Sequence, residues 1–169
     1  MAEKCEETIT MPVAVHTINF RGLAGGIFIS ISLAVVLYVI GFATVGWAVA
    51  RNHEGLWQSC SCGKISNAPD WFVATQAMIT IGLIGVLLAF ILVAIYMCVH
   101  SVSKNTTLIA LVVVCFLTVI FTVIGLGIYG SKREDTVSWS FAMTCVAGIL
   151  TLIGGILSIF QMRSSGVQM

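Results

Sequence analysis

The sequence predicts an all-α membrane protein, a left-handed bundle of four transmembrane helices with a short extracellular loop that has room for a small β-hairpin. Hydrophobic residues make up 59% of the 169 residues and charged residues only 9%. Ordinary soluble domains carry roughly 25% charged residues. A soluble fold so poor in charge could not cover its own surface, so lipid must surround much of this chain, and residues 1–169 form a single membrane domain.

The positions of the charges separate the chain into spans and connections. Every Lys, Arg, Asp and Glu falls in one of a few short zones: Glu3–Arg21, Arg51–Asp70, Lys104, Lys132–Asp135 and Arg163. Each uncharged stretch between these zones exceeds the roughly 20 helical residues that cross a bilayer core of about 30 Å. Helices are expected because every backbone N–H in hydrocarbon must be paired within its own segment.

The expected spans follow one another along the chain with short connections. They cover residues 23–50, 72–99, 107–129 and 137–162. The connections are a cytosolic N-terminal tail (1–22), a first extracellular loop (51–71), a cytosolic loop (100–106), a second extracellular loop (130–136) and a cytosolic tail (163–169).

The orientation follows from the cysteines of the first loop rather than from the basic residues. Lys and Arg are equally divided between the two sides, so the positive-inside rule favours neither orientation. Cys60 and Cys62 favour an oxidising compartment for their loop. We therefore expect both termini in the cytosol and a multi-pass protein in the plasma membrane.

The aromatic residues gather on the side of this loop. Trp47, Trp57, Trp71 and Trp139 all lie there, with Tyr129 at the end of the third span. Simple anchoring in the membrane interface is one explanation. Anchoring alone would place aromatic residues at both faces, so the one-sided group also suggests a packed aromatic cap that holds the loop against the bundle.

Small residues recur at intervals of four along three spans, which places each set on one helical face. Such faces let membrane helices approach closely. The expected packing residues are Gly26, Ser30 and Ala34 in the first span, Gly85 and Ala89 in the second, and Ala147, Thr151 and Gly155 in the fourth.

The first loop carries a motif that resembles a known family. Trp47, then Gly55-Leu56-Trp57, then Cys60 and Cys62 follow the W…GLW…C…C signature of the claudin superfamily. That group includes the claudins, the peripheral myelin and epithelial membrane proteins, and the channel-associated gamma subunits. The segments "DWFVATQAMITIG" and "WSFAMTCVAGILTLIGGIL" look like the peripheral myelin and epithelial membrane branch. The resemblance implies four spans, cytosolic termini and a disulfide between the loop cysteines.

Two features depart from the family pattern. Cys60 and Cys62 are separated only by Ser61, whereas the family's cysteines lie about ten residues apart, and a local bridge must still meet the usual Cα separation of 4.4–6.8 Å. Three alternatives are open for the pair: such a bridge, a bond to another chain, or two thiols. The loop is also short: a hairpin at ~3.3 Å per residue fits, and a four-stranded claudin sheet does not.

The chain shows no motif for enzymatic chemistry, so we expect neither an enzyme nor a cofactor, metal site or nucleic-acid partner. Cys98 lies near the cytosolic end of the second span, where cysteines are either palmitoylated or simply small apolar residues. Val167 and Met169 give the last three residues the apolar-x-apolar form that some cytosolic PDZ scaffolds bind.

Three functions fit these observations. The first is a claudin-like structural protein that organises cell–cell contacts or a junctional barrier through lateral and head-to-head association, as a homo-oligomer. The second is an auxiliary subunit of a larger ion channel or receptor, which the reduced loops favour. The third is a small-solute or ion pore, which the lack of charged or polar lining in the spans disfavours.

Overall fold

Four long helices form the protein in the computed structural model, which describes residues 22–49, 53–57, 69–98, 103–132 and 138–166. They are α1 (Leu23–Ala43), α2 (Asp70–Cys98), α3 (Lys104–Lys132) and α4 (Trp139–Gly166). All four are long and apolar enough to cross a membrane. The prediction of an all-α, four-span fold is therefore confirmed at this level, whereas the handedness of the bundle stays a prediction.

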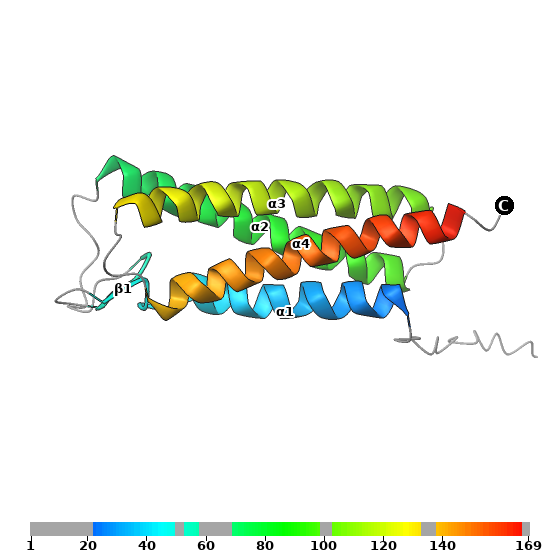
Figure 1. Ribbon diagram of the computed structural model, residues 1–169, viewed down its shortest axis with the longest axis horizontal. Coiled ribbons are helices and arrows are strands. Elements are labelled where there is room, and N and C mark those ends of the chain that lie inside the picture. Colours follow the sequence, from blue (N-terminus) through cyan, green and yellow to red (C-terminus); the bar gives the residue numbers. More distant parts are fainter. Residues whose placement is uncertain (1–21, 50–52, 58–68, 99–102, 133–137, 167–169) are drawn as a thin grey trace, which may run out of the picture.

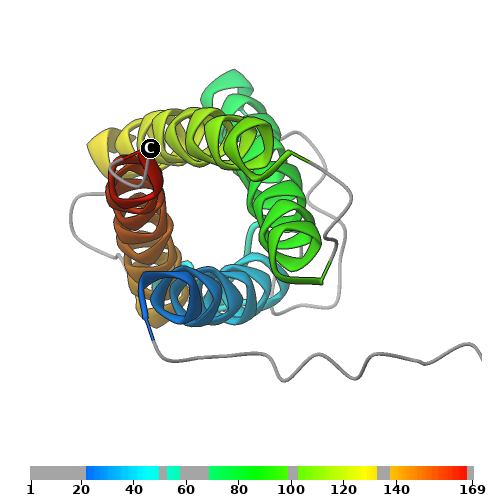
Figure 2. The ribbon, with the colours of Figure 1, turned by 90° about the vertical axis from the view of Figure 1, so that its right-hand side faces the viewer.

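The helices pack side by side in sequence order, and α4 closes the ring against α1 (Figures 1 and 2). Consecutive helices run in opposite directions (Figure 1). One end of the bundle carries the residues that follow α1, the start of α2, the end of α3 and the start of α4. We call this end the loop end.

Two short strands lie at the loop end. β1 (Ala48–Val49) pairs antiparallel with β2 (His53–Glu54), with Ala48 opposite Glu54 and Val49 opposite His53. Most of the remaining first loop lies outside the described residues. The prediction of a small β-hairpin in this loop therefore stays a prediction.

The helix boundaries differ from the expected spans most clearly in α1, which ends at Ala43 rather than at residue 50. The Thr44 hydroxyl donates a hydrogen bond to the Ile40 carbonyl, and the Trp47 indole N–H donates to the Gly41 carbonyl. The Ile40 carbonyl also accepts the backbone N–H of Thr44, so it is the indole of Trp47 that satisfies a carbonyl which the end of the helix leaves unpaired. The apolar pattern continues to residue 50, but the chain turns back over the bundle instead. The other three helices begin or end within about four residues of the expected bounds.

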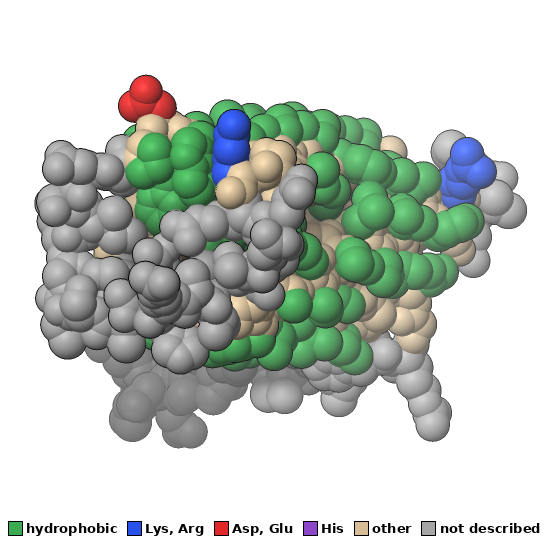
Figure 3. Space-filling model, turned by 60° about the vertical axis from the view of Figure 1, so that its left-hand side comes forward, with side chains coloured by type: hydrophobic (Ala, Val, Ile, Leu, Met, Phe, Trp, Pro, Cys, Tyr) green, Lys and Arg blue, Asp and Glu red, His purple; other side chains and the backbone are tan. Residues whose placement is uncertain are grey.

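The interior of the described bundle is filled by side chains from all four helices. Two clusters of buried hydrophobic residues follow one another along the axis, one towards each end. Tyr38, Ile79 and Val86 belong to the cluster at the loop end, and Ile31, Val93 and Leu111 belong to the other. The opposite, outward-facing side chains are mostly hydrophobic as well (Figure 3), as expected for helices surrounded by lipid.

The buried threonine hydroxyl groups within these helices find partners in their own helix. Thr118, Thr144 and Thr151, among others, each donate a hydrogen bond to the carbonyl four residues earlier. Every buried side-chain N or O atom in the described part of the chain has a partner. Serine and threonine can therefore serve as small packing residues here without leaving a polar group unpaired in an apolar surrounding.

Candidate functional site

The candidate site is the loop end, where residues 44–49 contact the start of α4. We call these residues the segment after α1. The backbone N–H groups of Ser138 and Ser140 donate to the carbonyls of Trp47 and Gly46, at 3.2 and 3.0 Å. The Thr44 and Ser140 hydroxyls lie 2.7 Å apart. Because Thr44 already donates to Ile40, the Ser140 hydroxyl donates in this pair. The segment thus supplies acceptors for N–H groups that the first turn of α4 cannot pair internally.

Trp47 is the central side chain of this arrangement and is completely buried. Its indole N–H donates to the Gly41 carbonyl at 2.7 Å, which gives a buried polar group the partner that it needs. Its ring meets Tyr129 edge to face at a centroid distance of 5.1 Å and Phe141 at 6.0 Å. Trp47 therefore joins the segment after α1 to both α3 and α4.

Tyr129 extends these contacts to α2. Its ring centroid lies 6.2 Å from that of Trp71 and 6.4 Å from that of Phe72, and these two rings pack edge to face on each other. The five side chains form what we call the aromatic cluster: Trp47, Trp71, Phe72, Tyr129 and Phe141. Offset and edge-to-face ring pairs each add about 0.5–1.5 kcal/mol beyond burial. The cluster thus connects three helices to the segment after α1.

The predicted aromatic cap divides into a buried and an exposed part. Trp47, Trp71 and Tyr129 belong to the aromatic cluster, together with Phe72 and Phe141, which the sequence analysis did not single out. Trp57 is 44% exposed and packs against Phe42 of α1, at a centroid distance of 5.4 Å. Trp139 is 50% exposed at the first position of α4. Two tryptophan side chains therefore face outwards at the loop end.

The Gly55-Leu56-Trp57 motif is held to α2 by one strong hydrogen bond. Leu56 is completely buried, and its carbonyl accepts a hydrogen bond of 2.6 Å from the Gln76 side-chain amide. Gly55 is also buried. The motif thus places a buried leucine on the bundle and the neighbouring Trp57 on the surface.

A second polar contact ties α1, α2 and α3 together below the aromatic cluster. The Tyr38 hydroxyl lies 3.2 Å from the Ile79 carbonyl and 3.0 Å from the Thr122 hydroxyl, which itself donates to the Thr118 carbonyl. Gly82 provides the space for this contact, because a Cβ there would overlap the Tyr38 hydroxyl. The lone tyrosine within the first span was the available signal, since a buried hydroxyl needs a partner.

The expected packing residues lie at several helix contacts. A Cβ on Gly26 would approach Leu157 to 3.6 Å, Gly154 lies near Ser30, and Gly155 lies against Cys115. Gly85 lies against Thr118, which places it between α2 and α3. The remaining members are completely buried: Ala34, Ala89, Ala147 and Thr151.

Some predicted residues cannot be placed. Cys60 and Cys62 lie outside the described residues, as do Val167 and Met169, so the disulfide and the PDZ ligand stay predictions. Cys98 is the last residue of α2, at the end opposite to the loop end, and its side chain is exposed. Its palmitoylation also stays a prediction.

The fold and the loop end show the class of this protein, but they do not show its family. Four membrane-spanning helices carry, at one end, an aromatic cluster of buried and half-buried side chains with two exposed tryptophans beside it. No protein-family model matches the chain. The likeness to the claudin superfamily therefore rests on the motif residues themselves.

Proposed function

We propose that this chain is a claudin-like, non-enzymatic protein of the plasma membrane that organises cell–cell contacts or a junctional barrier. Its loop end faces the outside and its termini lie in the cytosol. Copies associate laterally within one membrane and head to head between membranes. The support for membership of the superfamily is the order of Trp47, Gly55-Leu56-Trp57, Cys60 and Cys62 at the end of the first span.

The observation that carries the proposal is that Trp57 is exposed while its neighbours in the motif and in α1 hold it in position. Its ring is 44% exposed, while the adjacent Leu56 is fully buried and bonded to α2 through Gln76. Phe42 of α1 lies behind the ring. Exposed aromatic side chains that are held in one position lose little entropy on binding, and such residues carry much of the energy of protein contacts.

The filled interior weighs against the pore alternative. Side chains at 0–1% exposure follow one another along the axis of the described bundle, from Leu56 and Ile79 to Val93 and Leu108. Ion pathways through membrane proteins are lined by polar groups or surround water. A contact function uses the loop end and needs no path through the four helices.

Aggregation of otherwise non-adherent cells that express the chain tests the proposal. We expect the unaltered chain to aggregate the cells, and Trp57→Ala to lose most of that aggregation at equal surface expression. Truncating an aromatic residue at the centre of a contact costs ~2 kcal/mol or more. Ile29→Ala, at an exposed position of α1 remote from the loop end, is the control and should aggregate normally. Head-to-head contact is disproved if the unaltered chain causes no aggregation.

A second candidate is an auxiliary subunit of an ion channel or receptor. The connection between α3 and α4 favours it, because only residues 133–138 separate the two helices and leave little chain for a contact between cells. Recovery of the tagged chain in a mild detergent distinguishes the two. A large channel recovered in fixed ratio supports the auxiliary role, whereas homo-oligomers alone support the structural role.

A further inference from the structure

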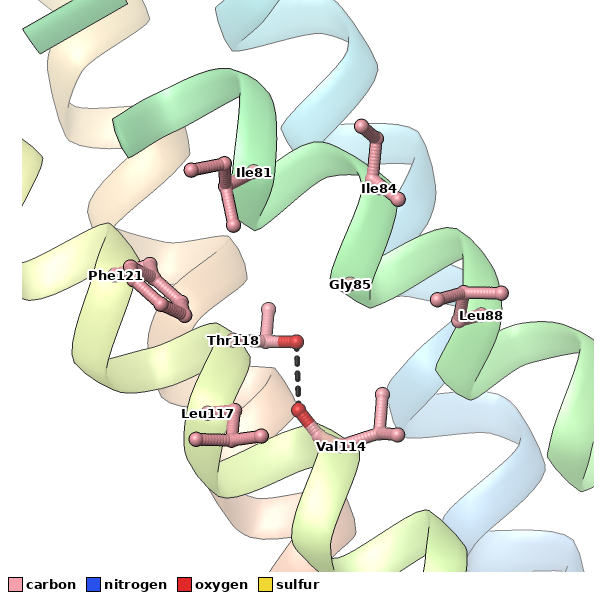
Figure 4. Close-up of a pocket in the computed structure, with 8 residues that line it drawn as sticks. All are labelled: Ile81, Ile84, Gly85, Leu88, Val114, Leu117, Thr118 and Phe121. Atoms are coloured by element: carbon pink, nitrogen blue, oxygen red, sulfur yellow. Dashed lines mark hydrogen bonds between the residues drawn. The ribbon is translucent and has the colours of Figure 1, made fainter. Parts of the chain in front are cut away.

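A groove of about 190 Å³ lies on the outer side of the bundle between α2 and α3 (Figure 4). Large apolar side chains form its rims, and a glycine and a threonine form its floor. On α2 the rim residues include Ile84 and Leu88, on α3 they include Leu117 and Phe121, and the floor is Gly85 and Thr118.

The floor of the groove offers no free polar group. Gly85 has no side chain, and a Cβ there would overlap the Thr118 hydroxyl. That hydroxyl donates a hydrogen bond of 2.7 Å to the Val114 carbonyl, as Figure 4 shows, and Thr118 is only 2% exposed. A ligand in the groove therefore meets almost only carbon atoms.

The groove lies at the middle of the spanning helices. Ile84 is equally far from the two ends of α2 (Asp70–Cys98), about 21 Å at 1.5 Å per residue. Leu117 lies about 20 Å from the nearer end of α3 (Lys104–Lys132) by the same rise. The surroundings at this depth are the hydrocarbon core of the membrane, which is about 30 Å thick.

We propose that this groove binds one acyl chain of a membrane phospholipid. A cavity of roughly 150 Å³ lined by apolar side chains holds a molecule the size of benzene, so the groove accommodates a stretch of at least about six chain carbons. An empty groove would deprive its lining of dispersion contacts, and a flexible chain can follow the space between Leu88 and Leu117.

Other apolar occupants fit the groove less well. A sterol would be anchored by its hydroxyl group, for which the floor has no accessible partner because Thr118 is only 2% exposed. A helix of a second copy would need a surface of small residues for close approach. The rims instead carry Ile84, Leu88 and Leu117, whose side chains are about half exposed and project towards any approaching helix.

Photolabelling of the full chain in phosphatidylcholine nanodiscs tests the proposal. A trace of phosphatidylcholine carries a diazirine in the terminal third of one acyl chain, and adducts are assigned to residues by mass spectrometry. We expect Leu117 and Phe121 to be labelled about threefold or more above Ile153, which is exposed at a similar depth on α4, since only dispersion contacts distinguish the groove from the general surface. Uniform labelling of these positions would overturn the proposal.

A matched pair of variants strengthens the test. Ile84→Trp adds volume at the rim and should lower labelling at Leu117 and Phe121 to the level at Ile153. Ile153→Trp makes the same change on the other face and should leave groove labelling unchanged. Equal groove labelling in both variants, cross-links between two protein chains at Leu117, or stronger groove labelling by a diazirine sterol would each contradict the acyl-chain assignment. The labelling pattern of the unaltered chain decides the question even if a variant fails to fold.

Discussion

Gly82 sets how closely α1, α2 and α3 approach one another around the Tyr38 hydroxyl. A Cβ at this position would overlap that hydroxyl and would lie 2.8 Å from the Thr122 hydroxyl. Both hydroxyls are already engaged, and the Tyr38 side chain is completely buried. The methyl group of an alanine therefore has no space unless the helices separate or Tyr38 gives up its partners.

Gly82→Ala is expected to lower the free energy of unfolding by about 1–3 kcal/mol, the usual cost of overpacking a filled interior. Gly127→Ala is the matched control, because nothing lies within 4 Å of a Cβ there and alanine is the better helix former. Reversible unfolding of the purified chain in mixed micelles, followed by circular dichroism, measures both changes. An equal effect of the two substitutions would show that helix propensity, and not the contact with Tyr38, decides the result.

Tyr38→Phe provides an internal test of the same contact. It removes the overlapping oxygen while Thr122 keeps its bond to the Thr118 carbonyl. Gly82→Ala should therefore cost less in the Tyr38→Phe background, with a coupling of about 0.5–3 kcal/mol between the two positions. A coupling of zero would mean that the alanine methyl group is accommodated elsewhere.

The sequence predicts the bounds of α2 and α3 well because charged residues lie at the ends of these helices. Asp70 begins α2, and Lys104 and Lys132 bound α3, which places the costly groups where the membrane ends. The end of α1 could not be predicted in the same way. Residues 44–50 carry no charge, and the helix ends where the indole of Trp47, six residues further along the chain, bonds back to the Gly41 carbonyl.

The aromatic cluster was also only partly predictable. Its tryptophans stand out by their position on one side, whereas Phe72 and Phe141 look like any apolar residue of a span. Phe72 and Phe141 belong to the cluster because of tertiary contacts: both rings pack on Tyr129, from helices that are far apart in sequence. The role of Gln76 could not be predicted for a related reason. Its partner is a backbone carbonyl in the loop, which carries no signal in the sequence.

Gln76 gives α2 its direct hold on the Gly55-Leu56-Trp57 motif. Gln76→Leu leaves the carbonyl of the buried Leu56 without this donor, at a cost of about 1–3 kcal/mol. Hydrogen exchange of a peptide that covers residues 53–57 should then become about tenfold faster, since 1.4 kcal/mol corresponds to a factor of ten. Thr80→Val removes a hydroxyl that bonds only to the Gln76 carbonyl within α2, and it should leave the exchange unchanged. Unaltered exchange in Gln76→Leu would mean that other contacts hold the motif.

The two ends of the four-helix bundle differ from each other, and a largely apolar middle separates them. At the loop end, side chains from α2, α3 and α4 meet the segment after α1 in one aromatic cluster. At the other end, Cys98 closes α2 and Lys104 begins α3. A contact between cells requires the loop end to face outwards, so the orientation in the membrane is the property on which the proposed function depends most directly.

Labelling with a membrane-impermeant maleimide on intact cells tests this orientation. The chain carries Ser131→Cys, an exposed position near the end of α3, in a background in which Cys5, Cys60 and Cys62 are serines. We expect the cysteine at position 131 to react on intact cells, and Cys98, exposed at the opposite end, to react only after the membrane is opened. Because the charged reagent cannot cross the hydrocarbon core, the two sites report opposite sides. Reaction of Cys98 on intact cells, with position 131 protected, would reverse the orientation and remove the basis for contact through Trp57.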